Sequence, residues 1–267
     1  MVIVIILLAL AALYLFAIKG RNGHPGWEQL EGWKYAHRGL HDKEKPENSM
    51  AAFRAALENG YGIELDVHLL KDGGLAILHD SSLKRICGVD AEMEDLCTED
   101  LTKYHLQGTD QTIPTFREVL DLYQGKAPLI VELKVARNNH VALCETACKM
   151  LDTYNGPYCL ESFDPRVVIW LKKNRPELIR GQLASNHFKA PSKLNWFTQF
   201  AATNMLANLI SRPDFIAYHY GPRKTLTNWL CKNLWGMKRV SWTLGTREEY
   251  DTAVKEGWIP IFENFKP

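Results

Sequence analysis

The sequence predicts a TIM (β/α)8 barrel, because strand-like and helix-like segments alternate along most of its 267 residues. Barrels of this kind often run to ~250 residues as one domain. The alternation predicts parallel strands joined by helices, and eight such strands close into a barrel. An open doubly wound sheet is the alternative, but the chain lacks the glycine-rich phosphate fingerprint of that fold.

Eight segments have the length and apolar character of buried strands. They are residues 35–37, 62–68, 129–134, 159–163, 179–183, 215–218, 240–244 and 259–263. Helical segments are expected between them, at residues 47–58, 114–123, 140–154, 164–174, 194–209, 223–234 and 246–256. Asp164 before Pro165 is a typical N-cap followed by proline at the first helical position. No eighth helix fits after the last strand.

One segment interrupts the alternation just after the second strand. Asp72-Gly73 separates two apolar stretches, which indicates a β-hairpin. We expect residues 75–79 to return antiparallel as an extra strand, which brings His79 back to the level of Asp66. Residues 81–112 then form a long polar loop with a helical turn near residues 98–104, and such a loop in a compact domain is usually functional.

The amino terminus differs from the rest of the chain. Residues 2–18 are 17 residues without a charge, at the short end of the roughly 17–25 that span a bilayer. A signal peptide is the alternative, but no basic residue precedes the run and no small-x-small cleavage site follows it. We therefore expect a transmembrane anchor at residues 1–18, a linker at 19–33 and a catalytic barrel at 34–267. Lys19 and Arg21 favour a cytoplasmic barrel.

Composition narrows the function classes. Lys plus Arg number 32 against 31 Asp plus Glu, so no field of one sign favours nucleic acid as a partner. The six cysteines form no Cys-x-x-Cys pair, and we expect reduced, mostly buried thiols. His140, Cys144 and Cys148 share one face of a helix, where ordinary packing is favoured over a metal site.

Acidic residues stand at the carboxyl ends of two predicted strands, where barrel active sites lie. Glu64 and Asp66 are two residues apart on one strand, so their carboxylates face the same side. Glu132 ends the next strand of the barrel. Each could pair with Lys or Arg, but three carboxylates converging at a narrow mouth favour one divalent cation, Mg²⁺ or Ca²⁺.

Two histidines accompany these carboxylates. His37 ends the first strand and His79 ends the hairpin, and both are candidates for proton transfer near neutral pH. Arg38 and Lys134 are cations for the phosphate oxygens. A metal, two cations and two imidazoles are what in-line displacement at a phosphodiester requires.

A series of short motifs runs through the chain in a characteristic order. They are Ala36-His37-Arg38-Gly39, Pro46-Glu47-Asn48-Ser49 with Ala52-Phe53, Gly62-Ile63-Glu64-Leu65-Asp66-Val67, Lys71-Asp72-Gly73, His79-Asp80, Ile113-Pro114-Thr115, Glu132-Leu133-Lys134, Ser162-Phe163-Asp164-Pro165 and Trp242-Thr243. From about Tyr35 to Trp258 the chain resembles the glycerophosphodiester phosphodiesterases.

The resemblance implies a TIM barrel enzyme that hydrolyses glycerophosphodiesters to sn-glycerol 3-phosphate and an alcohol. It implies a divalent cation on Glu64, Asp66 and Glu132, with His37 and His79 as the acid–base pair. The residues expected to hold the phosphate or the rest of the substrate are Arg38, Lys134, Phe163, Trp242 and Glu47. In such enzymes a substrate hydroxyl can attack first, and water then opens the cyclic phosphate.

Two departures from the family pattern stand out. The family commonly ends with Thr-Asp-x-Pro and a helix, whereas this chain ends Phe262-Glu263-Asn264-Phe265-Lys266-Pro267. The second is the apolar segment 195–209, with Trp196, Phe197, Phe200, Met205, Leu206 and Leu209. We expect it to be the buried face of the fifth barrel helix; the alternative is an apolar lip for an acyl chain or a bilayer.

Three other functions compete with hydrolysis of small glycerophosphodiesters. A lysophospholipase D would act on single-chain lipids at the membrane. A degenerate barrel would bind a phosphodiester or lipid headgroup without turnover, but every expected catalytic position is occupied here. A phosphoinositide-type phospholipase C shares the barrel and the histidines but fits the Glu-x-Asp hairpin pattern less well.

Overall fold

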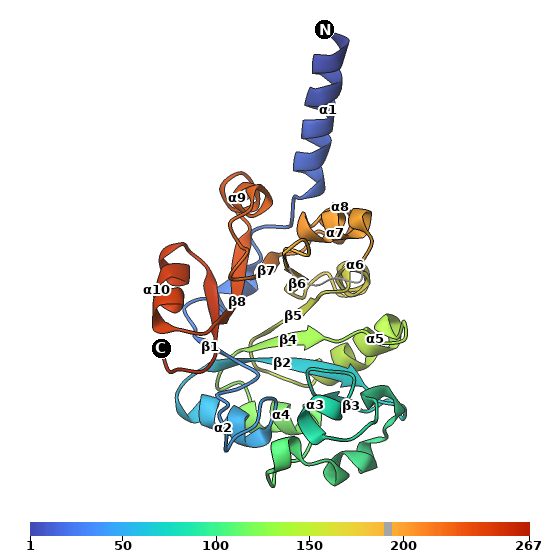
Figure 1. Ribbon diagram of the computed structural model, residues 1–267, viewed down its shortest axis with the longest axis vertical. Coiled ribbons are helices and arrows are strands. Elements are labelled where there is room, and N and C mark those ends of the chain that lie inside the picture. Colours follow the sequence, from blue (N-terminus) through green and yellow to red (C-terminus); the bar gives the residue numbers. More distant parts are fainter. Residues whose placement is uncertain (190–193) are drawn as a thin grey trace.

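Nine strands form one sheet, and eight of them close into a parallel barrel in this computed structural model, which describes residues 1–189 and 194–267 (Figure 1). The sheet order is β1-β9-β8-β7-β6-β5-β4-β2-β3, and a further pairing of β1 with β2 closes the ring. Only β3 is antiparallel, and it pairs with β2 outside the ring. The predicted TIM barrel with an added hairpin is therefore confirmed.

The barrel strands agree with the predicted segments to within two residues at each end. They are β1 (Tyr35–His37), β2 (Gly62–Leu69), β4 (Leu129–Leu133), β5 (Tyr158–Ser162), β6 (Arg180–Ala184), β7 (Phe215–His219), β8 (Lys238–Leu244) and β9 (Ile259–Phe262). The hairpin strand is β3 (Leu75–Ile77). Its end returns to β2, because the Leu78 amide donates to the Asp66 carbonyl at 3.2 Å.

Helices cover the outside of the barrel between successive strands. They are α2 (Met50–Glu58), α4 (Phe116–Tyr123), α5 (His140–Leu151), α6 (Pro165–Asn174), α7 (Trp196–Thr203) with α8 (Asn208–Ser211), α9 (Leu226–Asn233) and α10 (Arg247–Lys255). Local sequence explains their ends: the Ser49 hydroxyl caps α2, and Asp164 caps α6 ahead of Pro165. Among the described residues, no helix follows β9.

The long loop after β3 has a small hydrophobic core of its own. It contains the short helix α3 (Lys84–Cys87) and the 3₁₀ turns η2 (Met93–Asp95), η3 (Thr98–Lys103) and η4 (Leu106–Gly108). Its apolar side chains pack together and against the hairpin; they include Leu70, Leu78, Leu83, Ile86, Met93, Leu101 and Leu106. The loop is thus an ordered insertion with its own packing, beside the barrel mouth.

Side chains along each strand alternate between two apolar regions, as the period of two requires. In β2, Ile63, Leu65 and Val67 point outward to the helices. The barrel interior contains a second cluster formed by inward side chains such as Tyr35, Ile130 and Cys159. Because Glu64 and Asp66 alternate with the outward residues, they point into the barrel, Glu64 level with Ile130 and Asp66 level with Glu132.

The amino-terminal segment forms helix α1 (Val2–Ala17), which rises away from the barrel in Figure 1. Its 16 residues rise about 24 Å, whereas the hydrocarbon core of a bilayer is about 30 Å thick. Within the described residues, we find no helix that combines the length and apolar character needed to cross a membrane. The predicted transmembrane helix at residues 1–18 is therefore not supported. The predicted cytoplasmic location stays a prediction.

The segment 19–33 packs against the barrel instead of lying as a linker near a membrane surface. It contains η1 (Pro25–Gln29), and Trp27 and Leu30 are buried in the interior cluster opposite the catalytic mouth. The Arg21 guanidinium pairs with Asp214 and donates to the Leu178 carbonyl at 2.9 Å. This segment therefore closes the floor of the barrel.

Replacing Trp27 with alanine tests whether this floor is part of the folded domain. Trp27 is 6% exposed, and its ring meets Phe215 edge to face at 5.3 Å. Removing a buried aromatic side chain leaves a cavity, so we expect the free energy of unfolding to fall by about 3–5 kcal/mol. Urea denaturation followed by circular dichroism measures the change. A loss within ~0.5 kcal/mol, as for a surface substitution, would mean that the segment is a detachable linker.

The prediction that the apolar segment 195–209 is buried on the fifth barrel helix is wrong for its aromatic residues. The segment breaks into α7 and α8, and Trp196 and Phe197 are 68% and 70% exposed. Trp196 stacks on Phe200 with ring centroids 5.7 Å apart. Met205 alone of the named apolar residues is fully buried in the core. The segment follows the carboxyl end of β6, which is the end of the strand at the barrel mouth, so the exposed aromatic side chains belong to the connection that leaves the mouth.

Candidate active site

A cavity of about 450 Å³ opens at the carboxyl ends of the barrel strands, within the size range of small-ligand sites. Its lining is His37, Arg38, Glu64, His79, Glu132, Lys134, Glu161, Phe163, Leu183, Trp242 and Ile261. The structure thus brings together eight of the ten residues expected in the site and adds Glu161, which was not expected. Asp66 lies buried directly behind this lining, and its carboxylate contacts Lys134.

The three carboxylates expected to hold a metal converge. One oxygen each from Glu64, Asp66 and Glu132 lies within 4.8 Å of the other two. The register explains this, because Asp66 and Glu132 are direct partners on the neighbouring strands β2 and β4. All three residues are at most 6% exposed. Their oxygens match the hard ligands that Mg²⁺ and Ca²⁺ prefer.

Charge in this part of the barrel is unbalanced. Four buried carboxylates face the site, because Glu161 sits beside Glu132 on β5. Two cations face them: Lys134 Nζ lies 3.0 Å from Glu132 and 3.3 Å from Asp66, and Arg38 Nε lies 3.5 Å from Asp66. If all four carboxylates are ionised, two of their negative charges remain uncompensated by Lys134 and Arg38. One divalent cation would neutralise these two charges.

The pKa values express the same imbalance. Burial, with repulsion from Asp66 and Glu132, raises the pKa of Glu64 well above its ordinary value. Burial raises the pKa of Glu132 to about 7. Burial also opposes ionisation of Asp66, but Lys134, His79 and Arg38 hold its pKa well below the ordinary value. Glu161 Oε2 is buried without a hydrogen-bond partner among the described residues. These residues therefore fit a divalent cation, which would let all of them ionise.

Each of the two histidines is held by a carboxylate at Nδ1. His37 Nδ1 lies 2.7 Å from Glu263 Oε2, and His79 Nδ1 lies 2.6 Å from Asp80 Oδ1. A carboxylate at Nδ1 favours the tautomer with hydrogen there, so Nε2 keeps its lone pair. His37 Nε2 lies 3.9 Å from Glu64, on the side of the acidic cluster. Burial lowers the pKa of both imidazoles.

Arg38 is oriented by strained backbone and by a carboxylate network. Its φ is 53°, a conformation that side-chain-bearing residues rarely adopt and that is often found at functional sites. Its guanidinium donates to Glu47 at 2.8 Å, and Glu47 also accepts two bonds from Arg85. Glu47 therefore positions Arg38 from behind and is held by Arg85. Arg38 Nε is buried and makes no hydrogen bond among the described residues, so it can donate one to a bound anion.

Aromatic side chains form the opposite wall. The Phe163 and Trp242 rings meet edge to face with centroids 5.6 Å apart, and the His219 ring lies with its centroid 5.0 Å from that of Trp242. Trp242 Nε1 is buried and has no hydrogen-bond partner in the described part of the chain. The pair offers an apolar surface with one free donor for the part of a substrate that is not the phosphate.

Three site residues were missed from the sequence. Glu161 had a local signal: it follows the inward residue Cys159 by two, so it must also point inward. Glu263 belongs to the carboxyl-terminal segment that departs from the family pattern, and only the closure of β9 on β1 brings it to His37. Arg85 lies in the long loop, where no periodic pattern places a side chain.

The sequence model of the glycerophosphoryl diester phosphodiesterase family matches residues 37–263. A glycerophosphodiester phosphodiesterase of Caldanaerobacter subterraneus is 28% identical over 232 residues, covering 83% of this chain and 89% of that protein. Lysophospholipase D GDPD1 of Homo sapiens is 33% identical over 125 residues, but these cover 42% of this chain and 38% of that protein.

Solved structures show the same fold. An Oleispira antarctica phosphodiesterase in complex with the product sn-glycerol-3-phosphate superposes with a TM-score of 0.74 at 21% identity, covering 91% of this chain and 95% of that chain. A glycerophosphodiester phosphodiesterase from Thermotoga maritima has a TM-score of 0.66 at 22% identity, covering 86% and 93%.

Proposed function

The chain belongs to the glycerophosphoryl diester phosphodiesterase family, and we propose that it hydrolyses small glycerophosphodiesters to sn-glycerol 3-phosphate and an alcohol with one divalent cation and two histidines. It is a phosphoric diester hydrolase. The observation that carries the finer proposal is the acidic cluster of Glu64, Asp66 and Glu132, with an imidazole held by its own carboxylate on either side.

Glu64, Asp66 and Glu132 would hold the cation, which would supply positive charge to a phosphate oxygen during displacement. Arg38 and Lys134 bind the other phosphate oxygens. The wall of Phe163 and Trp242 holds the organic part of the substrate, and burial of the site keeps bulk water away from the reacting groups.

The two imidazoles divide the proton transfers. Nε2 of one takes the proton from the glycerol hydroxyl that attacks phosphorus, and the other, protonated, gives its proton to the leaving alkoxide. The product of this step is a cyclic phosphate. In the second step the roles reverse, because the first imidazole returns its proton as the ring opens and the second takes one from water.

Chelation tests the metal. Full-length protein assayed with glycerophosphocholine or glycerophosphoethanolamine is expected to release glycerol 3-phosphate, and EDTA is expected to abolish this release. Without the cation, the raised pKa values of Glu64 and Glu132 favour the protonated carboxyl groups, and the phosphate loses its main positive partner.

Adding back Mg²⁺ and Ca²⁺ separately to the chelated enzyme shows which ion restores turnover. Full activity after exhaustive chelation would remove the metal from the mechanism and would assign the acidic cluster to ion pairs with Lys134 and Arg38 alone.

The pH dependence follows from the histidines. Burial lowers the pKa of His37 and of His79, so the free imidazole that acts as base persists below the ordinary value of 6.5. On the acidic side, activity is lost as pH falls through the lowered pKa of the base; on the alkaline side, it is lost as the imidazole that acts as acid gives up its proton. We therefore expect the acidic limb of kcat/KM, which reports the free enzyme, to lie below pH 6.5. A limb above pH 6.5, measured at saturating cation, would contradict this.

A lysophospholipid is the second candidate substrate, favoured by the exposed aromatic residues of α7. Trp196 and Phe197 offer an apolar surface that a deacylated substrate does not need. Side-by-side rates on glycerophosphocholine and lysophosphatidylcholine decide between the two. If the lipid is the substrate, the double variant Trp196→Ser, Phe197→Ser should lose lipid activity and keep its rate on glycerophosphocholine.

A further inference from the structure

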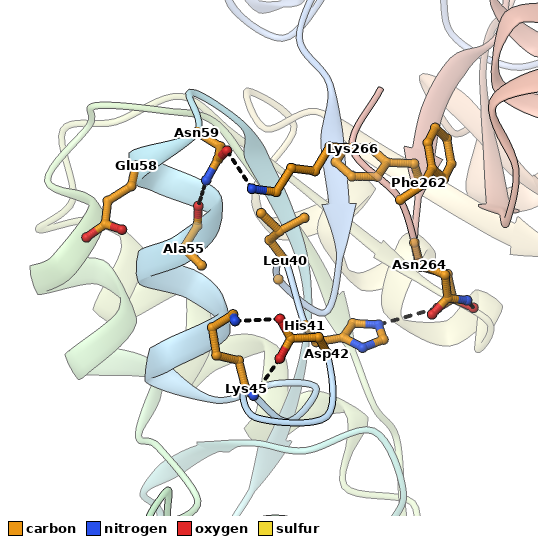
Figure 2. A pocket seen from close by; sticks show the side chains of 13 residues that line it. Leu40, His41, Asp42, Lys45, Ala55, Glu58, Asn59, Phe262, Asn264 and Lys266 are labelled. Carbon is orange, nitrogen blue, oxygen red and sulfur yellow. Dashed lines mark hydrogen bonds and ion pairs between the residues drawn. The ribbon is translucent and has the colours of Figure 1, made fainter.

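A second cavity lies on the other side of His37, between α2 and the carboxyl-terminal segment (Figure 2). Its volume is about 400 Å³, and its lining includes His41 from the loop after β1 and Glu263 from the end of β9. Glu263 therefore stands between the two cavities, with its carboxylate on His37 Nδ1 at 2.7 Å. A solute entering this second cavity reaches His41 and Glu263, the carboxylate partner of His37, from outside the substrate cavity.

His37, His41 and Glu263 form the second group in the described chain that has the ligand spacing of a metal site. One ligand atom of each lies within 4.8 Å of the others. Glu263 Oε2 lies 2.7 Å from His37 Nδ1 and 3.6 Å from His41 Nε2. Ligand atoms around a tetrahedral zinc ion are roughly 3.3 Å apart, so small side-chain rotations are enough to place all three.

The chemistry of this group differs from that of the acidic cluster. Two imidazole nitrogens and one carboxylate suit zinc and its neighbours, whereas three carboxylates suit Mg²⁺ or Ca²⁺. His41 Nε2 is buried and has no hydrogen-bond partner among the described residues. The hydrogen bond from His37, with the His41 imidazole 3.6 Å away, holds the pKa of Glu263 well below its ordinary value, so the carboxylate is ionised. Two further charges of the cavity neutralise each other, since Lys45 pairs with Asp42 (Figure 2).

We propose that His37, His41 and Glu263 bind a divalent transition metal of the zinc type, and that this binding inhibits the enzyme. Binding at His37 Nδ1 displaces the proton that Nδ1 shares with Glu263. This proton leaves to solvent, and solvent returns one proton to Nε2, so the number of protons on the ring is unchanged. The neutral imidazole then carries its only hydrogen on Nε2, which faces the acidic cluster. A ring with hydrogen on Nε2 and metal on Nδ1 has no lone pair left to take a proton from the substrate.

The inhibition rests on the proposed catalytic role of His37, whereas the binding does not. The experiment therefore measures both. Zn²⁺ is titrated into full-length protein at saturating Mg²⁺ or Ca²⁺, with turnover followed in one arm and binding followed by calorimetry in the other. Co²⁺ replaces Zn²⁺ in a third arm, because its visible absorption reports four-coordinate nitrogen ligation.

His41→Ala is the decisive variant, because it removes one ligand and leaves both His37 and Glu263 in place. Compared with its own uninhibited rate, it is expected to need at least ~10-fold more Zn²⁺ for half inhibition, by analogy with the loss of metal-site partners, and to lose the Co²⁺ spectrum. His105→Ala, on an exposed loop histidine, is the matched control and should behave as wild type.

Glu64→Gln separates the two metal sites. It disrupts the acidic cluster, yet it should still bind one Zn²⁺ at His37, His41 and Glu263. Zinc inhibition that is equally strong in His41→Ala would place the inhibitory ion at the acidic cluster and overturn the proposal. So would Zn²⁺ binding that His41→Ala leaves unchanged. If wild type turns over no glycerophosphodiester but binds Zn²⁺ through His41, the proposed function fails and the metal site stands.

Discussion

Replacing either His37 or His79 with alanine is expected to lower kcat by ~100- to 10,000-fold, the usual size of a general acid or base contribution. Both imidazoles line the cavity, and each has Nδ1 fixed by a carboxylate so that Nε2 is free for proton transfer. Removing one leaves the cation, Arg38 and Lys134 to bind the phosphate. We therefore expect KM to change much less than kcat.

The control for both variants is His105→Ala, on an exposed loop residue whose ring bonds the Thr109 carbonyl at 2.9 Å. Its rate should equal that of wild type. The fold of each variant is checked by its thermal unfolding midpoint. A rate within threefold of wild type for His79→Ala would take His79 out of the mechanism, even if His37→Ala behaves as expected.

The barrel could be predicted because its signals are local. Each strand shows its own apolar run, and most of the helices around the barrel have a side-chain N-cap. Asp72-Gly73 specifies the hairpin that carries His79 back to the mouth. The convergence of Glu64, Asp66 and Glu132 also follows from local rules. Strand period places the first two on one face, and adjacency of β2 and β4 brings the third alongside.

The partners of the catalytic groups could not be predicted, because they depend on closure of the ring. Glu263 and His37 are 226 residues apart, and they meet only because β9 pairs with β1. Arg85 reaches Glu47 from a loop whose path is set by its small hydrophobic core. No period or spacing in a single sequence encodes such contacts.

The predictions for the amino-terminal helix and for the segment 195–209 failed for a different reason. Apolar composition predicts that a helix is buried, but it does not show which part of the molecule covers it. Residues 2–17 and 196–203 are both apolar enough to suggest burial in a bilayer or a core. The structure leaves Trp196 and most of α1 exposed. Trp27 shows the opposite error: it belongs to a polar segment, yet its side chain is buried at the floor of the barrel.

Glu64→Gln is expected to lower kcat/KM by at least ~100-fold while leaving the metal-free protein as stable as wild type or more stable. Loss of partners outside the ligand shell already costs 10- to 100-fold in metal affinity or activity, and Glu64 is a proposed direct ligand. Its raised pKa means that the native state holds a proton that the unfolded state releases. Wild-type stability in EDTA therefore falls as pH rises above the ordinary carboxyl pKa, and the glutamine variant escapes this loss.

Metal reverses the order of stability in this comparison. A cation at one hundred times its dissociation constant stabilises the native state by about 2.7 kcal/mol, so wild type should gain that amount from Mg²⁺ or Ca²⁺ and Glu64→Gln should gain far less. Thermal unfolding with EDTA and with each cation measures both effects, with Glu145→Gln, an exposed position on α5, as the matched control. Equal stabilisation of wild type and Glu64→Gln by the cation would show that Glu64 is not a ligand. A variant less stable than wild type in EDTA would show that the Glu64 carboxylate is paired well enough to need no metal.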